Sequence, residues 1–249
     1  AEAVAGTAKA DLGKMPEWDL SDLYKGPDAP EVARDLKAAG DEAKRMKAAY
    51  QGKLSDLAND GGKLLLAIKD YEKLSDLMGK LGSYCGLYYA QNQADPARVK
   101  FYGDVSEPLT KTSTDLIFFE LELNKVDDVL IDAALTHKDL ARYKPWFDDL
   151  RKEKPHQLDE QIETLFTEKS QTSRGAFNRL FDETMASLRF DVNGEALTLE
   201  PTLNLMQDRD PAKRKAGAEA LARTFKENLR LFTLITNTLA KDKEIGDRW

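Results

Sequence analysis

The feature that most constrains this chain is the spacing of its apolar residues, which recur three and four positions apart over long segments. The first such stripe consists of Val32, Leu36, Ala39, Ala43, Met46 and Tyr50. Residues with this spacing share one face of an α-helix, so the stripe predicts an amphipathic helix that needs a covering partner. Similar stripes occur within residues 74–88, 101–119 and 221–239. We expect an all-α protein, mainly helical, built as antiparallel helical hairpins or a bundle.

Helix starts support this prediction. Asp95-Pro96 and Asp210-Pro211 each place an aspartate at the capping position and a proline at the first helical position, where the missing N–H costs nothing. Asp28 is the expected cap of the first helix, since Pro30 lies in its first turn and Glu31 occupies the capping-box position. Each of these sites is expected to open a helix.

Glycine, proline and polar turn residues are expected to divide the rest of the chain into further helices. Gly52 is expected to end the first helix, and residues 59–62 form a turn before the next stripe. Pro108 is expected to kink or divide the helix that begins at Pro96. Two shorter helices are predicted at 159–169 and 176–188, with a polar turn between them.

One segment departs from the helical spacing. Residues 188–192 alternate apolar and polar, Asn193-Gly194 follows, and residues 197–199 alternate again. This pattern predicts one small β-hairpin near residues 188–199, with Phe190 opposite Leu197 and Leu188 opposite Leu199. Because an isolated hairpin is marginally stable, its apolar side should pack on a helix.

Charge and composition exclude several classes of protein. The 249 residues carry a formal net charge of -7, which argues against nucleic acid or an anionic membrane as a partner. Apolar runs such as 64–68 are far shorter than the roughly 20 residues that span a bilayer. We therefore expect a soluble, cytoplasmic chain. Residues 1–14 are expected to be a disordered leader, with a signal cleaved upstream of Ala1 as the alternative.

The sequence contains no complete catalytic or metal-binding motif. His137 and His156 each stand alone, outside any HExxH pair, and are expected to be ordinary surface or interhelix histidines. The carboxylate pairs Asp127-Asp128 and Asp148-Asp149 are expected to be helix caps or solvated charges. The glycines at 61, 62, 79 and 82 lack the strand and the Lys-Ser pair of a phosphate loop, and there is no GxSxG elbow. We predict no catalytic residue and no metal ligand.

The cysteine and a tyrosine cluster are expected to serve packing. Cys85, the one cysteine, lies on the apolar stripe of its helix and excludes both an internal disulfide and a thiolate zinc cluster. Tyr84, Tyr88 and Tyr89 lie on two faces of the same helix, which favours packing with the hydroxyls at the rim. The alternative is that they line a cleft that holds peptide side chains. Residues 118–123 are apolar on two sides and are expected to form a central, covered element.

Several short motifs, in order, resemble one family. The opening is Pro16-Glu17-Trp18-Asp19-Leu20-Ser21-Asp22-Leu23-Tyr24, followed by Phe118-Phe119-Glu120-Leu121-Glu122. Then come His156-Gln157-Leu158-Asp159, Ser173-Arg174-Gly175-Ala176-Phe177, Leu180-Phe181-Asp182-Glu183, and Asp208-Arg209-Asp210 with Arg214. Their order and spacing, over nearly the whole chain, resemble the N-terminal portion of oligoendopeptidase F, a family of thimet-type zinc metallopeptidases.

The resemblance implies a deep bowl of helices, with zinc held on its floor by an HExxH helix and a later glutamate. These residues would all lie downstream of Trp249, so no zinc ligand, general base or oxyanion stabiliser can be carried over to this sequence. Residues 15–187 would form the N-terminal helical lobe and one wall of the bowl. Residues 188–249 would form the hairpin and the first helices of an incomplete catalytic lobe.

The implied function is that of a non-catalytic part of a peptidase that hydrolyses short oligopeptides with zinc as cofactor. The chain alone is expected to bind no zinc and to show no peptidase activity. Its expected partners are short peptides in the parent enzyme and the missing C-terminal catalytic lobe. Helices from Pro211 onward are expected to expose apolar faces, which predicts self-association. The alternative is a stand-alone helical module that binds a peptide or protein, or serves as a scaffold, without catalysis.

Overall fold

A computed structural model describes residues 18–249, so the expected leader at 1–14 and the first residues of the opening motif lie outside the described part. The helices are α1 (Pro30–Tyr50), α2 (Leu54–Leu57), α3 (Gly61–Ala90), α4 (Pro96–Lys125), α5 (Asp128–Ala134), α6 (Lys144–Glu153), α7 (Glu160–Lys169), α8 (Arg174–Ser187), α9 (Leu199–Leu205), α10 (Pro211–Glu227) and α11 (Leu229–Gly246). Short 3-10 turns occupy Ala141–Tyr143 and Lys154–His156, and two strands, β1 (Phe190–Val192) and β2 (Glu195–Leu197), form an antiparallel pair. The predicted fold class is confirmed.

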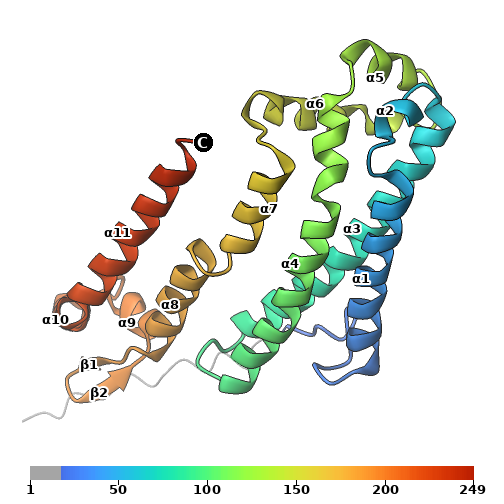
Figure 1. The fold of residues 1–249 in the computed structure, drawn as a ribbon. Helices are drawn as coiled ribbons and strands as arrows, with labels where there is room; N and C mark the ends of the chain where they lie inside the picture. The colour runs from blue at the N-terminus through green and yellow to red at the C-terminus, as the bar shows by residue number, and fades with distance from the viewer. Residues whose placement is uncertain (1–17) are drawn as a thin grey trace, which may run out of the picture.

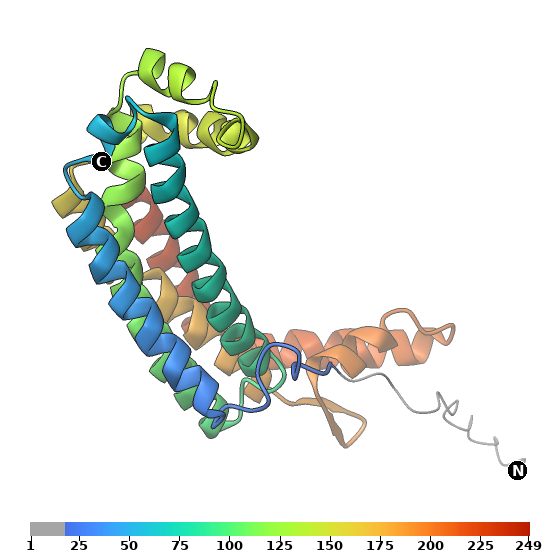
Figure 2. The same cartoon turned by 90° about the vertical axis from the view of Figure 1, so that its right-hand side faces the viewer.

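The core is formed by three long helices, α1, α3 and α4, which run side by side (Figures 1 and 2). Their predicted apolar stripes face one another, and Ala39, Ala43 and Met46 of α1 are fully buried. Phe118 and Phe119 of α4 are also buried, which confirms the prediction of a central, covered element around residues 118–123. The Phe119 ring stacks on Tyr71 of α3 with 4.5 Å between ring centroids.

The opening motif anchors the chain to this bundle. Tyr24 is buried, and its hydroxyl donates a hydrogen bond of 3.0 Å to Asp35 of α1. Its ring also meets the edge of Tyr84 at 5.2 Å between centroids. Burial and the neighbouring Asp35 carboxylate raise the pKa of Tyr24. The described part of the motif therefore contributes packing and a buried hydrogen bond.

Two helix starts follow the prediction, and one does not. Asp95 accepts a hydrogen bond from the Ala97 N–H at 2.9 Å, and Asp210 accepts one from Ala212 at 2.8 Å. The cap predicted at Asp28 is wrong, because Ala29 occupies the capping position and no side chain accepts a bond there. Since proline lacks an N–H, a helix that begins at Pro30 already has one fewer donor to satisfy.

Other predicted boundaries are met in part. Gly52 follows the end of α1 with φ +75°, a left-handed conformation that suits glycine. The predicted turn at 59–62 is shorter than expected, because Asp60 caps α3 and the helix already begins at Gly61. Pro108 does not divide α4, which continues through it to Lys125.

The hairpin is shorter than predicted. Phe190 pairs with Leu197 as expected, and Asn193 and Gly194 have φ of 54° and 88°, as a two-residue turn of this type requires. The predicted pairing of Leu188 with Leu199 is wrong, because Leu199 begins α9 and its backbone is helical. Phe190 is fully buried and meets Phe225 of α10 with 5.5 Å between centroids, so the hairpin packs on a helix as predicted.

The C-terminal helices are thinly covered. α11 contacts α8 and α10, and its ribbon diverges from that of α7 towards the C-terminus (Figure 1). In α11 only Ile235 is buried, whereas Leu229 is 60% exposed and Leu234 is 57% exposed. The expectation that helices after Pro211 expose apolar side chains is therefore met by α11 but not by α10, in which Leu221 and Phe225 are half-buried.

Cys85 has the environment that its place on the stripe predicts. The residue is 2% exposed, and burial raises the pKa of its thiol to about 11. Its Sγ atom lies 3.8 Å from the Tyr102 carbonyl oxygen of α4. Within residues 18–249, no helix has both the length and the apolar character needed to span a bilayer.

Candidate binding site

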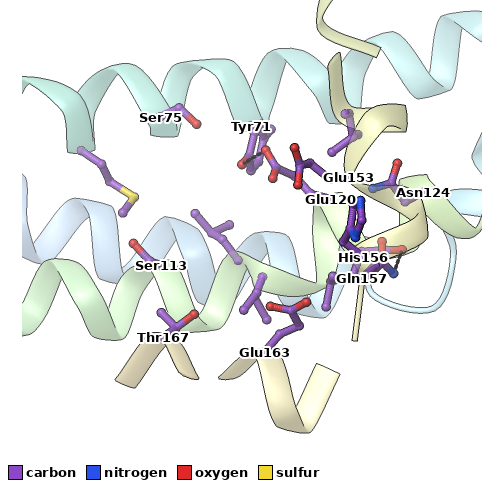
Figure 3. Close-up of a pocket in the computed structure, with 15 residues that line it drawn as sticks. Tyr71, Ser75, Ser113, Glu120, Asn124, Glu153, His156, Gln157, Glu163 and Thr167 are labelled. Carbon is purple, nitrogen blue, oxygen red and sulfur yellow. Dashed lines mark hydrogen bonds between the residues drawn. The ribbon is translucent and has the colours of Figure 1, made fainter. Parts of the chain in front are cut away.

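A cavity of about 510 Å³ lies beside the bundle, between α3, α4, α6 and α7 (Figure 3). We call it the α3–α7 cavity. Its polar lining residues are Tyr71, Ser75, Ser113, Glu120, Asn124, Glu153, His156, Gln157, Glu163 and Thr167. Its apolar lining residues are Met78, Leu116, Ile117, Leu121 and Leu150. A pocket of this size with an apolar lining and several convergent polar groups is typical of a ligand site.

Three carboxylates from three elements line this cavity: Glu120 of α4, Glu153 of α6 and Glu163 of α7. Glu120 accepts a hydrogen bond of 2.8 Å from the Tyr71 hydroxyl. Burial and the nearby Glu120 charge raise the pKa of Tyr71, so this hydroxyl stays protonated and acts as a donor. Glu163 accepts a bond of 3.0 Å from the Leu158 N–H, which fixes the start of α7.

Neither lysine nor arginine lines the cavity, and His156 is the one basic side chain among its lining residues. Within residues 18–249, none of the three glutamates forms a salt bridge. The cavity therefore carries an excess of negative charge, in contrast to the many paired carboxylates elsewhere on the surface.

Two amide oxygens at the cavity lack hydrogen-bond partners. Asn124 is only 3% exposed, and its Oδ1 atom is buried without a partner. The Oε1 atom of Gln157 is also buried without one, while the Nε2 of the same side chain donates to the Leu121 carbonyl at 2.9 Å. This bond orients the Gln157 amide, because its nitrogen is already used. Buried polar atoms without partners are uncommon and point to a missing donor.

Arg151 holds the cavity wall together. Its guanidinium donates to the carbonyl oxygens of Asn124 at 2.8 Å and Val126 at 3.0 Å, at the C-terminal end of α4. The last carbonyls of a helix have no partner within the helix, and a cation at this end is also favoured by the helix dipole. Arg151 thus secures α6, which carries Glu153, against the helix that carries Glu120.

The structure separates the two histidines. His156 lies at the edge of the α3–α7 cavity, next to Gln157 (Figure 3), and is exposed. His137 is half-buried beside the first turn of α3, where a Cβ atom added to Gly61 would lie 2.8 Å from the His137 Cβ. They therefore serve different parts of the fold.

The paired aspartates have the expected structural roles. Asp127 caps α5 by accepting the Val129 N–H at 2.8 Å. Asp128 forms salt bridges with Arg151 and Lys154. Asp148 pairs with Lys144 and Asp149 with Lys152, both on exposed helix surface.

A second cavity of about 740 Å³ lies between the C-terminal end of α3, the first half of α4 and the start of α8. Its lining includes Tyr89, Arg174, Arg179 and Asp182, so both signs of charge are present. The Tyr89 hydroxyl is buried without a partner, and burial is the main cause that raises its pKa to about 12. Of the three clustered tyrosines, Tyr89 lines this cavity, whereas Tyr84 and Tyr88 pack with Phe101.

The described residues offer no place for the zinc that the resemblance implies. Within residues 18–249, no three His, Cys, Asp or Glu side chains converge as a metal site requires. We therefore derive no reaction step through zinc from these residues. The α3–α7 cavity offers a ligand acceptor oxygens and an apolar lining.

Comparison with solved structures defines the class of this fold. The crystal structure of oligoendopeptidase-F from Enterococcus faecium matches with a TM-score of 0.73 at 19% identity, covering 88% of this chain and 44% of that chain. The fold of this chain therefore resembles part of that structure.

Sequence comparison finds similarity to the same kind of protein. A family model described as oligopeptidase F matches residues 122–190. Oligopeptidase PepF of Bacillus subtilis (strain 168) is 22% identical over 233 residues, which cover 90% of this chain and 34% of that protein. Together these matches confirm the predicted resemblance: the chain is similar to the N-terminal portion of oligopeptidase F proteins. It spans about a third of the length of the B. subtilis relative.

Several of the motifs that carry the resemblance supply lining residues to the two cavities. Gln157 and His156 line the α3–α7 cavity, while Arg174 and Asp182 line the second one. Sequence reasoning did not single out Glu120, Glu153 or Glu163 as site residues, since Glu153 and Glu163 belong to no motif and Glu120 was interpreted as part of a central, covered element. The 118–122 and 156–159 motifs both supply lining residues and were the signals that pointed to this region.

Proposed function

We propose that this chain is the N-terminal, non-catalytic part of a zinc-dependent metalloendopeptidase that hydrolyses short oligopeptides in the cytoplasm. The observation that carries the proposal is the match to oligopeptidase F proteins along nearly the whole chain, but over less than half of each relative. In this proposal the zinc ligands and the general base belong to a further, C-terminal segment. The chain supplies one wall of the substrate cavity.

Exposed apolar side chains support the proposal that a further segment packs on this chain. Leu229 and Leu234 of α11 are more than half exposed, and Phe181 of α8 is 42% exposed. Large exposed apolar side chains on neighbouring helices can mark a surface that another element covers. We propose that the C-terminal catalytic lobe covers these side chains in the whole protein.

Expression of the complete reading frame that contains this chain tests the proposal. We expect a product that holds zinc and cleaves a quenched fluorescent oligopeptide, with cleavage abolished by a chelator and restored by zinc. The 249-residue chain, purified in parallel, is expected to cleave nothing. Zinc-dependent turnover by the short chain that survives repurification would contradict the proposed division of roles.

The alternative is a helical binding module that functions without catalysis. It is favoured by one observation, namely that the α3–α7 cavity is formed entirely by helices of this chain. If the reading frame ends at Trp249 and the product neither holds zinc nor cleaves peptide, the binding-module function replaces the peptidase proposal.

A further inference from the structure

We propose that the α3–α7 cavity binds a cationic group of a peptide, an ammonium or a guanidinium, on an aliphatic stem. The inference rests on the proposed function in that it takes the ligand to be a peptide. It then assigns to one cavity a charge preference that follows from its own residues.

The first argument is charge. Glu120, Glu153 and Glu163 line the cavity, and it contains no lysine or arginine to neutralise them. Carboxylates that face one another across a cavity repel, and the shielding by water weakens as a ligand displaces it. A cation between them would relieve this repulsion, whereas an anionic ligand would increase it.

The second argument is the kind of hydrogen-bonding atom left without a partner. Asn124 is only 3% exposed, and its Oδ1 atom has no hydrogen-bond partner. The Oε1 atom of Gln157 likewise has none, and its orientation is set by the bond from Nε2 to the Leu121 carbonyl. Both atoms are acceptors, so the missing group is a donor. Ammonium offers three donors and guanidinium five, and neither accepts.

The third argument is the shape of the apolar lining. Met78, Leu116 and Ile117 lie along the part of the cavity that α3 and α4 form, while Glu120 and Asn124 follow on α4 one to two turns further along. An extended basic side chain places its methylene groups on apolar surface and its charge among polar groups. The cavity has both surfaces in this order along α4.

Peptide binding to the 249-residue chain tests the inference. The probes are short acetylated and amidated peptides that differ at one position, which holds lysine, arginine, norleucine or glutamate. Titration calorimetry at low ionic strength gives the affinities. We expect the lysine or arginine peptide to bind about tenfold more tightly than the norleucine peptide, the effect of about one charge-assisted hydrogen bond. The preference should weaken in high salt.

Two variants assign the preference to this cavity. Glu153→Gln with Glu163→Gln removes two charges and keeps the side-chain lengths, including the acceptor that the Leu158 N–H uses. The ratio of lysine to norleucine affinity is expected to fall to about one, a tenfold change. Glu168→Gln is the matched control, because Glu168 is exposed on the same helix α7 but does not line the cavity. It should keep the ratio of the unmodified chain.

A further arm identifies the source of the cation. An unblocked peptide without basic side chains is compared with its acetylated form. If the free amino terminus raises affinity and the double variant removes the gain, the cavity holds a terminal ammonium, which also supports the inference. A basic side chain that raises affinity identifies the side chain instead.

Equal affinity for the charged and neutral peptides, or no binding by any of them, overturns the inference. So does a preference that the double variant and Glu168→Gln change equally. These outcomes are distinct from failure of the proposed function, which is judged by zinc-dependent cleavage in the complete protein. Cleavage without a charge preference contradicts this inference alone, and a charge preference without cleavage contradicts the peptidase proposal alone.

Discussion

The three-helix bundle and the C-terminal helices carry the same kind of apolar stripe but use it differently. In the bundle, α3 and α4 bury their stripes against each other and against α1, down to fully buried side chains such as Phe119 and Leu123. In α11, Ile235 is the single buried residue, and Leu229, which belongs to the 221–239 stripe, remains 60% exposed. An amphipathic pattern therefore indicates that another element must cover the apolar face of a helix. It does not indicate whether that element lies within these 249 residues.

The energetic consequence is a difference in what each region contributes to stability. Burial of apolar surface is the main favourable term in folding, and it scales with the area removed from water. The bundle should thus dominate the free energy of unfolding. The C-terminal helices should be the first part of the chain to open, because they have few buried contacts.

The largest effect is expected from Phe119→Ala in the bundle. Loss of a fully buried phenylalanine that stacks on Tyr71 should lower the free energy of unfolding by about 3 to 5 kcal/mol. Phe181→Ala in α8, where the ring is 42% exposed, should cost about 1 kcal/mol or less. Urea titration followed by far-UV circular dichroism measures both. Equal losses would remove the distinction between the two regions.

A smaller effect is expected from Tyr24→Phe at the edge of the bundle. The change removes the hydrogen bond to Asp35 and should cost about 1 to 2 kcal/mol at neutral pH. Burial raises the Asp35 pKa, but hydrogen bonds from Arg34 and Tyr24 lower it more, so the net pKa lies below the usual 3.8.

The pH dependence of that variant follows from this sign. A folded-state pKa below the unfolded value gives stability that is present above about pH 4 and is lost as the pH falls through the folded pKa. The difference between the unmodified chain and Tyr24→Phe should therefore shrink in acid. Urea midpoints measured from pH 7 to pH 3 check this, and a difference that grows in acid would contradict it.

Helix caps sharpen the comparison, because the same motif opens one helix in each region. Asp95→Ala and Asp210→Ala each remove one cap hydrogen bond, worth about 1 kcal/mol. Asp95→Ala should lower global stability, whereas Asp210→Ala should mainly speed amide hydrogen exchange in α10. Asp76→Ala, at an exposed position inside α3, is the control without a cap. Identical global effects of the two cap variants would show that the regions unfold as one unit.

The smallest effect on stability is expected from Leu229→Glu with Leu234→Glu on α11. Both side chains are mostly exposed, so the free energy of unfolding should change by about 0.5 kcal/mol or less. Self-association, expected from the uncovered face, should fall in sedimentation velocity measurements. If the unmodified chain is monomeric across the concentration range, the prediction of self-association is wrong.

Local rules were enough to predict much of the fold. Asp95 and Asp210 are followed directly by proline, and their caps depend only on neighbours in sequence, so both formed as expected. Phe190 and Leu197 paired because Asn193 and Gly194 can adopt positive φ. The extension of that hairpin to Leu199 failed, since the residues after Leu197 turn into α9, whose Thr202 is buried.

The cavity could not be predicted in the same way. Glu120, Glu153 and Glu163 are separated by 33 and 10 positions in sequence and come together only when α4, α6 and α7 are placed by the bundle. Arg151 contributes to this placement through two backbone carbonyls, which leave no trace in a sequence pattern. The missing information was tertiary packing rather than helix propensity.

The reactivity of the buried Cys85 thiol can report how often the helix bundle opens. Alkylating reagents react with the thiolate. The raised pKa of about 11 keeps the Cys85 thiol protonated, and the closed bundle keeps reagents away from it. Because this is the one cysteine in the sequence, every modified molecule must have exposed the interface of α3 and α4 at least once. The rate of thiol labelling in buffer should therefore depend on opening of the bundle and not on motion of the C-terminal helices.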